Sequence, residues 1–257
     1  MAKTAAKLEA LDRITERLPM LDVWTRPEPG SRKPRFSRDD IAGAAMRIAD
    51  AEGFEAVSMR RIAAELDAGT MTLYHYVRTK DELLTLVTDA FMGEVVVPHG
   101  EALPTNWRDA VTVIARRTRD ALLRHPWVLD ISDDPAFGPN GVRHFDQSLQ
   151  ALSSLRLELE DKLEIISAVD ELVFGHCLQF RNNHAGGDGQ SDTGMIDYVT
   201  ELIATGEYPE LRRLADERPM LETWRRTWRT MSDPARFDRT LSRLLDGIER
   251  DLVRRRR

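Results

Sequence analysis

The sequence predicts an all-α protein, and three observations lead to this fold class. Apolar residues recur at steps of three or four along most of the chain, which places them on one face of a helix. Clusters of Pro, Gly and Asp separate these apolar segments, as helix-breaking residues do. No run of alternating β-branched residues bounded by turns indicates a strand. At 257 residues the chain is long enough for a buried core and about two domains.

Residues 1–35 are expected to form an amphipathic helix and a basic linker. Leucine and isoleucine residues recur at helical spacing from residue 3 to residue 22, with charged residues between them. The stretch RPEPGSRKPRFS then contains three prolines and one glycine, which exclude a helix and indicate an extended connector. Four Lys or Arg residues occur within positions 32–38, with no acid among them.

Two helices are expected directly after the linker. Ser37 begins the first, because Asp40 three places further on gives the pattern of a capping box, and Gly53 ends it. The second helix runs from about Ser58 to Leu66, with apolar residues at helical spacing.

A three-residue turn, Asp-Ala-Gly, separates the second helix from a short third helix at 70–76. Thr79, with Glu82 three residues later, is expected to cap a longer fourth helix. Two short helices joined by such a turn form a helix-turn-helix, whose second helix enters the major groove of DNA. The pattern therefore predicts a DNA-binding domain at 36–82.

The stretch TMTLYHYVRTK at 70–80 indicates how the third helix would be used. Leu73 and Val77 are four residues apart, so they share one face and are expected to hold the helix to the domain. The outer face would then contact DNA, with Thr70, Thr72 and His75 as candidates for bases and Tyr74, Tyr76 and Lys80 for phosphates. Arg60, at the start of the second helix, would neutralise a phosphate. The alternative is that the aromatic residues pack against another domain or another protein.

The charge distribution is compatible with DNA binding although the whole chain has a net charge of −6. Residues 1–31 carry five basic and five acidic side chains, and residues 32–82 carry nine of each. The acidic surplus therefore lies in 83–257. The basic stretch SRKPR could follow the DNA backbone as an arm, or be a solvated linker.

A cytoplasmic protein is expected. The single cysteine, Cys177, excludes an internal disulfide framework and fits a reducing compartment. No stretch approaches the roughly 18 apolar residues of a membrane span, and the N-terminus lacks the apolar region of a signal peptide.

Residues 83–257 are expected to form a larger helical domain. Its candidate helices lie at about 106–125, 139–155, 159–183, 195–205, 208–217 and 234–253. The glycine-rich stretch HAGGDGQSDTG at 184–194 indicates a mobile loop. Two apolar stripes fit a dimer interface or ordinary core: Leu163, Ile166, Val169, Leu172, Val173 and His176, and Leu241, Leu244, Leu245, Ile248 and Leu252. An interface is favoured, because a helix this late in the chain has few later partners to cover it.

Residues 37–92, SRDDIAGAAMRIADAEGFEAVSMRRIAAELDAGTMTLYHYVRTKDELLTLVTDAFM, resemble the N-terminal DNA-binding domain of the TetR family of bacterial repressors. The matching pieces are AEGFEAVSMRRIAAEL and TLYHYVRTKDELL, and the remainder resembles the C-terminal domain of the tetracycline-repressor branch less specifically. By motif position, the resemblance implies DNA contacts at Arg60, Thr70, Met71, Thr72, Tyr74, His75, Tyr76 and Lys80. Asp67 departs from the glycine often found in the family's turn.

The resemblance also implies a homodimeric repressor on a palindromic operator, released when a small molecule binds the C-terminal domain and changes the separation of the recognition helices. Six residues on helices that match the family's pocket walls are ligand candidates: Phe91, His144, Phe145, Asp170, Glu171 and Phe174. The alternative is that these aromatic residues are core and these carboxylates are solvated.

Neither a metal nor a cofactor is expected. His176 and Cys177 are adjacent, so they diverge by about 100° around a helix and cannot chelate one metal without further ligands. An enzyme is a disfavoured alternative, because no glycine-rich phosphate motif and no catalytic motif is present. A helical protein-interaction module without DNA binding is the other alternative.

Overall fold

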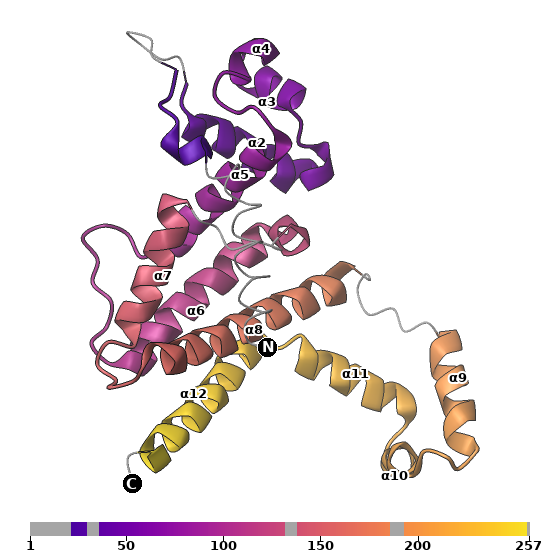
Figure 1. The fold of residues 1–257 in the computed structure, drawn as a ribbon. Coiled ribbons are helices and arrows are strands. Elements are labelled where there is room, and N and C mark those ends of the chain that lie inside the picture. Colours follow the sequence, from indigo (N-terminus) through magenta and orange to yellow (C-terminus); the bar gives the residue numbers. More distant parts are fainter. Residues whose placement is uncertain (1–21, 30–35, 132–137, 186–192, 256–257) are drawn as a thin grey trace, which may run out of the picture. The chain divides into compact units, whose positions relative to one another are not determined.

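The computed structural model describes residues 22–29, 36–131, 138–185 and 193–255, and every regular element in these ranges is a helix (Figure 1). The predicted all-α class is therefore confirmed. Two compact units, residues 1–167 and 168–257, make up the chain. The stretch SRKPR and most of the expected loop at 184–194 lie outside the described residues. So does the helix expected at 3–22, apart from its last residue, which begins a helical turn at 22–25.

The helix-turn-helix part of the first unit follows the predicted order of elements. It comprises α2 (Arg38–Glu52), the 3-10 turn η1 (Phe54–Ala56), α3 (Met59–Glu65), α4 (Thr70–Leu73) and α5 (Lys80–Val95). Ser37 and Asp40 form the predicted capping box at the start of α2. Gly53 ends α2 with a φ of 84°, a conformation that strains any residue with a Cβ.

The helix α5 connects the DNA-binding part of the first unit to its other helices, because it packs against α2, α6 and α7. These further elements are α6 (Trp107–Arg124), the 3-10 helix η2 (Pro126–Asp130) and α7 (Pro139–Ala151). Asp89 of α5 accepts hydrogen bonds from the backbone N–H groups of Asn140 at 3.0 Å and Gly141 at 2.9 Å. A carboxylate from α5 therefore caps the first turn of α7 and fixes the position of α7 on α5.

The second unit contains most of α8 (Leu159–Ala185), which begins in the first unit, and four further helices. They are α9 (Thr193–Ala204), α10 (Pro209–Glu217), α11 (Met220–Met231) and α12 (Arg236–Arg255). The helices expected from the sequence do not include α11, which lies between Pro219 and Pro234. Met220, Trp224 and Met231 do have helical spacing, and this pattern could have identified the helix.

The helices α8 and α12 contact each other in the second unit through the rings of His176 and Phe237. Phe237 is fully buried, with its ring centroid 5.0 Å from that of His176. Leu241 and Leu245, two members of the late apolar stripe, are each 2% exposed within a single chain, so this chain's own core already covers them. Leu244, Ile248 and Leu252 are only half-buried, and their use in a dimer interface remains a prediction. Among the described helices, none is long and apolar enough to cross a membrane.

Candidate nucleic-acid interface

The turn between α3 and α4 obtains its geometry from Asp67. Its φ is 47°, and it is the one residue other than glycine with a positive φ in the described part of the chain. The N–H of Ala68 donates to the carbonyl of Ala63 at 2.8 Å, and the N–H of Asp67 donates to that of Ala64 at 3.3 Å. These two bonds form a Schellman motif, which normally places glycine at the left-handed position. Aspartate tolerates this conformation, so the departure from glycine leaves the turn intact.

The inner face of α4 is as predicted. Leu73 and Val77 are completely buried. One turn of α-helix ends at Leu73, and further hydrogen bonds continue the helical path: the N–H groups of Tyr76 and Val77 both donate to the Leu73 carbonyl. The segment 70–77 is therefore a short recognition helix fixed to the domain through two apolar side chains.

The outer face of this recognition helix is exposed. Met71 is 74% exposed and Tyr74 is 43% exposed, and Thr72 and His75 are also exposed. Thr70 is half-buried at the N-terminal end. Large apolar and aromatic side chains left in water without a partner are typical of a binding surface.

One predicted member of the outer face is misplaced. Tyr76 is 6% exposed, and its ring lies against Phe36, with the centroids 5.2 Å apart and the planes tilted by 51°. The physical reason is helical spacing, since Tyr76 follows Leu73 by three residues and so shares the inner face with Leu73 and Val77. The prediction that placed its side chain on the outer face is wrong.

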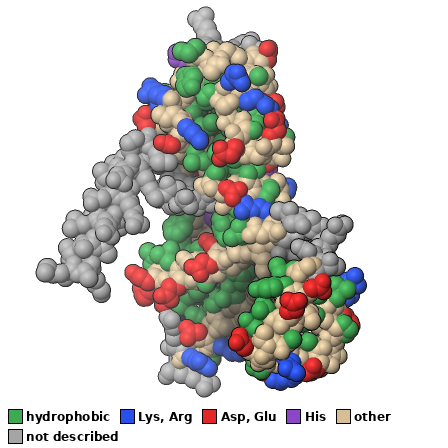
Figure 2. Space-filling view, turned by 90° about the vertical axis from the view of Figure 1, so that its right-hand side faces the viewer, with side chains coloured by type: hydrophobic (Ala, Val, Ile, Leu, Met, Phe, Trp, Pro, Cys, Tyr) green, Lys and Arg blue, Asp and Glu red, His purple; other side chains and the backbone are tan. Residues whose placement is uncertain are grey.

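Two basic side chains flank the recognition helix. Arg60 and Lys80 lie in the first turns of α3 and α5, are exposed, and form no ion pair with any described residue. Arg47 and Arg61 of the same region are paired with Glu65 and Glu52. On the face that Figure 2 shows, basic and acidic side chains are interspersed in the upper part.

The structure reveals a polar cluster between the DNA-binding part of the first unit and α6 that sequence reasoning missed. Nδ1 of His125 lies 2.7 Å from Asp50 of α2, and Nε2 lies 3.1 Å from Glu94 of α5. The indole N–H of Trp127 donates to the same Asp50 oxygen at 2.7 Å. The cluster ties the last turn of α2 to the C-terminal end of α6.

Three ligand candidates lie in the first unit. Phe91 is 3% exposed and meets the His125 ring edge-on, with the centroids 6.2 Å apart. Burial lowers the pKa of His144 below its ordinary value. Phe145 is 47% exposed. Phe91 is therefore a core residue of the first unit, whereas Phe145 is open to solvent.

The other three ligand candidates lie on the part of α8 that belongs to the second unit. Burial raises the pKa of Asp170 to about 6. Phe174 is half-buried, and Glu171 is exposed. The use of these residues in ligand binding remains a prediction.

The exposed recognition helix, reached from α3 by a tight turn, defines a helical DNA-binding protein of the helix-turn-helix class. Comparison with protein families then specifies the class. The model for bacterial regulatory proteins of the tetR family matches residues 41–87, and the model for the tetracyclin repressor-like C-terminal domain matches residues 100–252. Because the second match alone spans more than half of the chain, the protein belongs to the TetR family. It is therefore a DNA-binding transcription regulator and not an enzyme.

Individual relatives agree with this assignment. The HTH-type transcriptional repressor DrrR1 of Streptomyces coeruleorubidus is 32% identical over 245 residues, which cover 91% of this chain and 85% of that protein. Apo ActR from Streptomyces coelicolor has a TM-score of 0.67 and 28% identity, covering 86% of this chain and 99% of that chain. ActR in complex with actinorhodin has a TM-score of 0.64 and 31% identity, covering 84% and 98%.

Proposed function

We propose that this TetR-family protein represses transcription as a homodimer on a palindromic operator, and that a small-molecule effector releases it. The observation that carries the proposal is the recognition helix, whose inner side chains are completely buried while its outer side chains are left in water. The similarity to a transcriptional repressor over most of both chains supports the direction of regulation. In this proposal residues 36–82 bind DNA in the cytoplasm, 83–257 bind the effector and form the dimer, and 1–35 are an extension.

The exposed residues divide into two roles. Thr72, His75 and the half-buried Thr70 contact base edges, and Met71 adds apolar contact of the kind that thymine methyl groups accept. Tyr74, Arg60 and Lys80 bind phosphates, which fixes the orientation of the recognition helix in the groove. Tyr76 packs in the core of the DNA-binding part and does not contact phosphate.

A homodimer would place two recognition helices on one face of DNA. Their half-sites would be about one helical turn, roughly 34 Å, apart, and the operator would have the two-fold symmetry of the protein. The structures of ActR with bound small molecules support a small-molecule effector. In this proposal the cluster around His125 serves release within the first unit, because its hydrogen bonds join the C-terminal end of α6 to Asp50 of α2.

Selection of duplex DNA from a random pool tests this function without knowledge of the operator. We expect the full-length protein to enrich a two-fold symmetric sequence, and its affinity to fall steeply as salt rises, because bound phosphates release counterions. Enrichment of no sequence, with no salt-dependent binding, would contradict the proposal and favour a protein-interaction module. The effector is then sought as a small molecule that lowers affinity for the selected DNA.

A further inference from the structure

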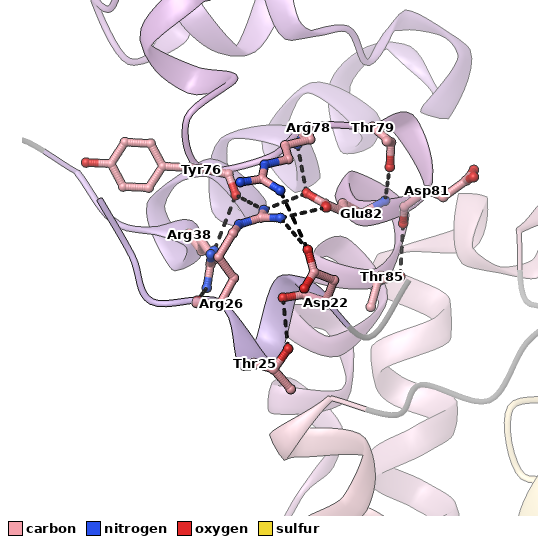
Figure 3. Close-up of polar contacts among 10 residues, drawn as sticks. All are labelled: Asp22, Thr25, Arg26, Arg38, Tyr76, Arg78, Thr79, Asp81, Glu82 and Thr85. Carbon is pink, nitrogen blue, oxygen red and sulfur yellow. Dashed lines mark hydrogen bonds and ion pairs between the residues drawn. The ribbon is translucent and has the colours of Figure 1, made fainter. Parts of the chain in front are cut away.

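A segment that precedes the matched DNA-binding domain packs against the recognition helix. The N-terminal segment, residues 22–29, lies before the matched range 41–87 and consists of a helical turn followed by an extended stretch. Its Val23 is completely buried. Figure 3 shows that Arg26 of this segment points toward Glu82 at the start of α5 and toward the backbone of Tyr76. The segment therefore contacts both ends of the connection between the recognition helix and α5.

Arg26 binds Glu82 with two parallel hydrogen bonds. Its Nη1 donates to Oε1 at 3.1 Å, and its Nη2 donates to Oε2 at 2.9 Å. Nη2 also donates to the Tyr76 carbonyl at 3.1 Å. The Arg26 side chain is 13% exposed and that of Glu82 is 6% exposed, so this is a largely buried pair and not a surface contact. One guanidinium thus joins the last residues of the recognition helix to the first turn of α5.

Arg38 strengthens the same junction from α2. Its Nε donates to the Tyr76 carbonyl at 3.3 Å, and its Nη1 donates to the Arg26 carbonyl at 2.9 Å. Its backbone N–H donates to the Glu28 carboxylate at 3.0 Å. The Tyr76 carbonyl therefore accepts from two cations, which is favourable because carbonyls at a helix C-terminus carry partial negative charge.

The charge state of Glu82 depends on this arrangement. Burial opposes ionisation of Glu82, but hydrogen bonds from Arg26 and from the backbone N–H of Arg78 outweigh it and lower the pKa of the carboxyl. The hydrogen bond to Glu82 in turn raises the pKa of Arg26. Removing one member of such a pair leaves the other as an uncompensated buried charge. The geometry of the junction is therefore sensitive to either residue.

We propose that Arg26 is a positioning residue for DNA recognition: it fixes the C-terminal end of the recognition helix on α5 and does not itself touch DNA. Both of its terminal nitrogens already donate to protein acceptors, which leaves them unavailable to phosphates. The consequence for operator affinity rests on the proposed function. The effect on the recognition helix itself does not, because it is a property of the free protein.

Hydrogen exchange on the free, full-length protein tests the positioning role. In Arg26→Met we expect the amides of His75, Tyr76 and Val77 to exchange about tenfold faster than in wild type, because their helix loses its attachment to α5. Arg47→Met is the matched control, since Arg47 forms an exposed pair with Glu65 of α3 and its loss should leave these amides unchanged. Unchanged exchange in Arg26→Met, or equal acceleration in both variants, would overturn the proposal.

Glu82→Gln gives a second test, because positioning and simple charge effects predict opposite changes in operator affinity. Removing an acid beside DNA should tighten binding, yet we expect Glu82→Gln to weaken binding to the selected operator about tenfold, with an unchanged salt slope and unchanged affinity for random DNA. Asp81→Asn, the same charge change at the exposed neighbouring position, should leave binding equal or tighter. Tighter binding by both variants would overturn the proposal. If wild type binds no DNA, the proposed function fails, and hydrogen exchange still decides the role of Arg26.

Arg26→Lys is a conservative variant that distinguishes the two-pronged contact from charge alone. It keeps a cation at the site but cannot donate two parallel bonds to one carboxylate. We expect operator affinity and amide protection between those of wild type and Arg26→Met. Values equal to those of Arg26→Met support the two-pronged contact as well, whereas wild-type affinity and protection in Arg26→Lys would show that the charge alone is sufficient and would contradict it.

Discussion

Substitutions of Tyr76 distinguish two roles for this residue: contact with DNA through the hydroxyl, and packing in the domain core through the ring. The sequence placed its hydroxyl among the phosphate contacts, whereas its ring is 6% exposed and packs on Phe36. Two substitutions separate these roles. Tyr76→Phe removes only the hydroxyl, and Tyr76→Ala removes the buried ring.

The expected magnitudes follow from burial. Truncating a buried aromatic ring to alanine costs about 3–5 kcal/mol of unfolding free energy, so Tyr76→Ala should be strongly destabilised. Tyr76→Phe keeps the contact with Phe36 and should change stability by less than about 1 kcal/mol. If the hydroxyl bound a phosphate, its loss would cost roughly 1.5–3 kcal/mol of binding free energy, which is a tenfold or larger loss of affinity.

The measurements are urea unfolding of each variant and titration of the selected operator at several salt concentrations. We expect Tyr76→Phe to bind like wild type with the same salt slope, and Tyr76→Ala to unfold at a much lower urea concentration. A tenfold weaker Tyr76→Phe with normal stability would refute this reasoning. That result would mean that the Tyr76 hydroxyl contacts DNA.

Three further predictions use the same assays. Lys80→Ala should weaken binding to all DNA sequences alike and reduce the salt slope of binding by about 0.9. Thr72→Ala should weaken binding to the operator alone, by roughly 1–3 kcal/mol. Binding titrations with operator and with random DNA measure both effects. The pKa of Asp170 is raised in the folded state to about 6, so ionisation of this carboxyl opposes folding. The stability that the protonated carboxyl contributes is present at low pH and is lost as pH rises through about 6. Urea unfolding from pH 4 to 7 should therefore show a free energy of unfolding that depends less on pH in Asp170→Asn than in wild type. Gly138→Ala should lower the unfolding free energy by about 1–3 kcal/mol, because the added Cβ would collide with the Asp89 carboxyl that caps α7; normal stability would mean that α7 can shift.

Local sequence signals were enough to predict the helix-turn-helix. The caps at Ser37 and Thr79 depend on residues at most three positions away, and each of these side chains accepts the expected backbone N–H. The inner face of the recognition helix was also predictable, because Leu73 and Val77 are one helical turn apart. Three aromatic rings in succession suggest one surface, but helical spacing puts Tyr76 on the inner face with Leu73 and Val77.

Contacts between distant segments could not be predicted in the same way. Glu82 was expected to complete a capping box with Thr79, but its carboxylate accepts from Arg26, 56 positions away, and from the N–H of Arg78. The approach of His125 to Asp50 spans 75 positions and has no sequence pattern. Such pairs depend on how helices pack after they form, so periodicity and capping patterns carry no information about them.

The central claim is that the exposed face of the recognition helix distinguishes one DNA sequence from another. Its most direct test is the ratio of affinities for selected operator and random DNA in a triple variant with Met71→Ala, Thr72→Ala and His75→Ala, all exposed and expected to leave the fold intact. We expect the ratio to fall close to one while affinity for random DNA is retained. A triple variant that keeps the wild-type ratio would contradict the claim.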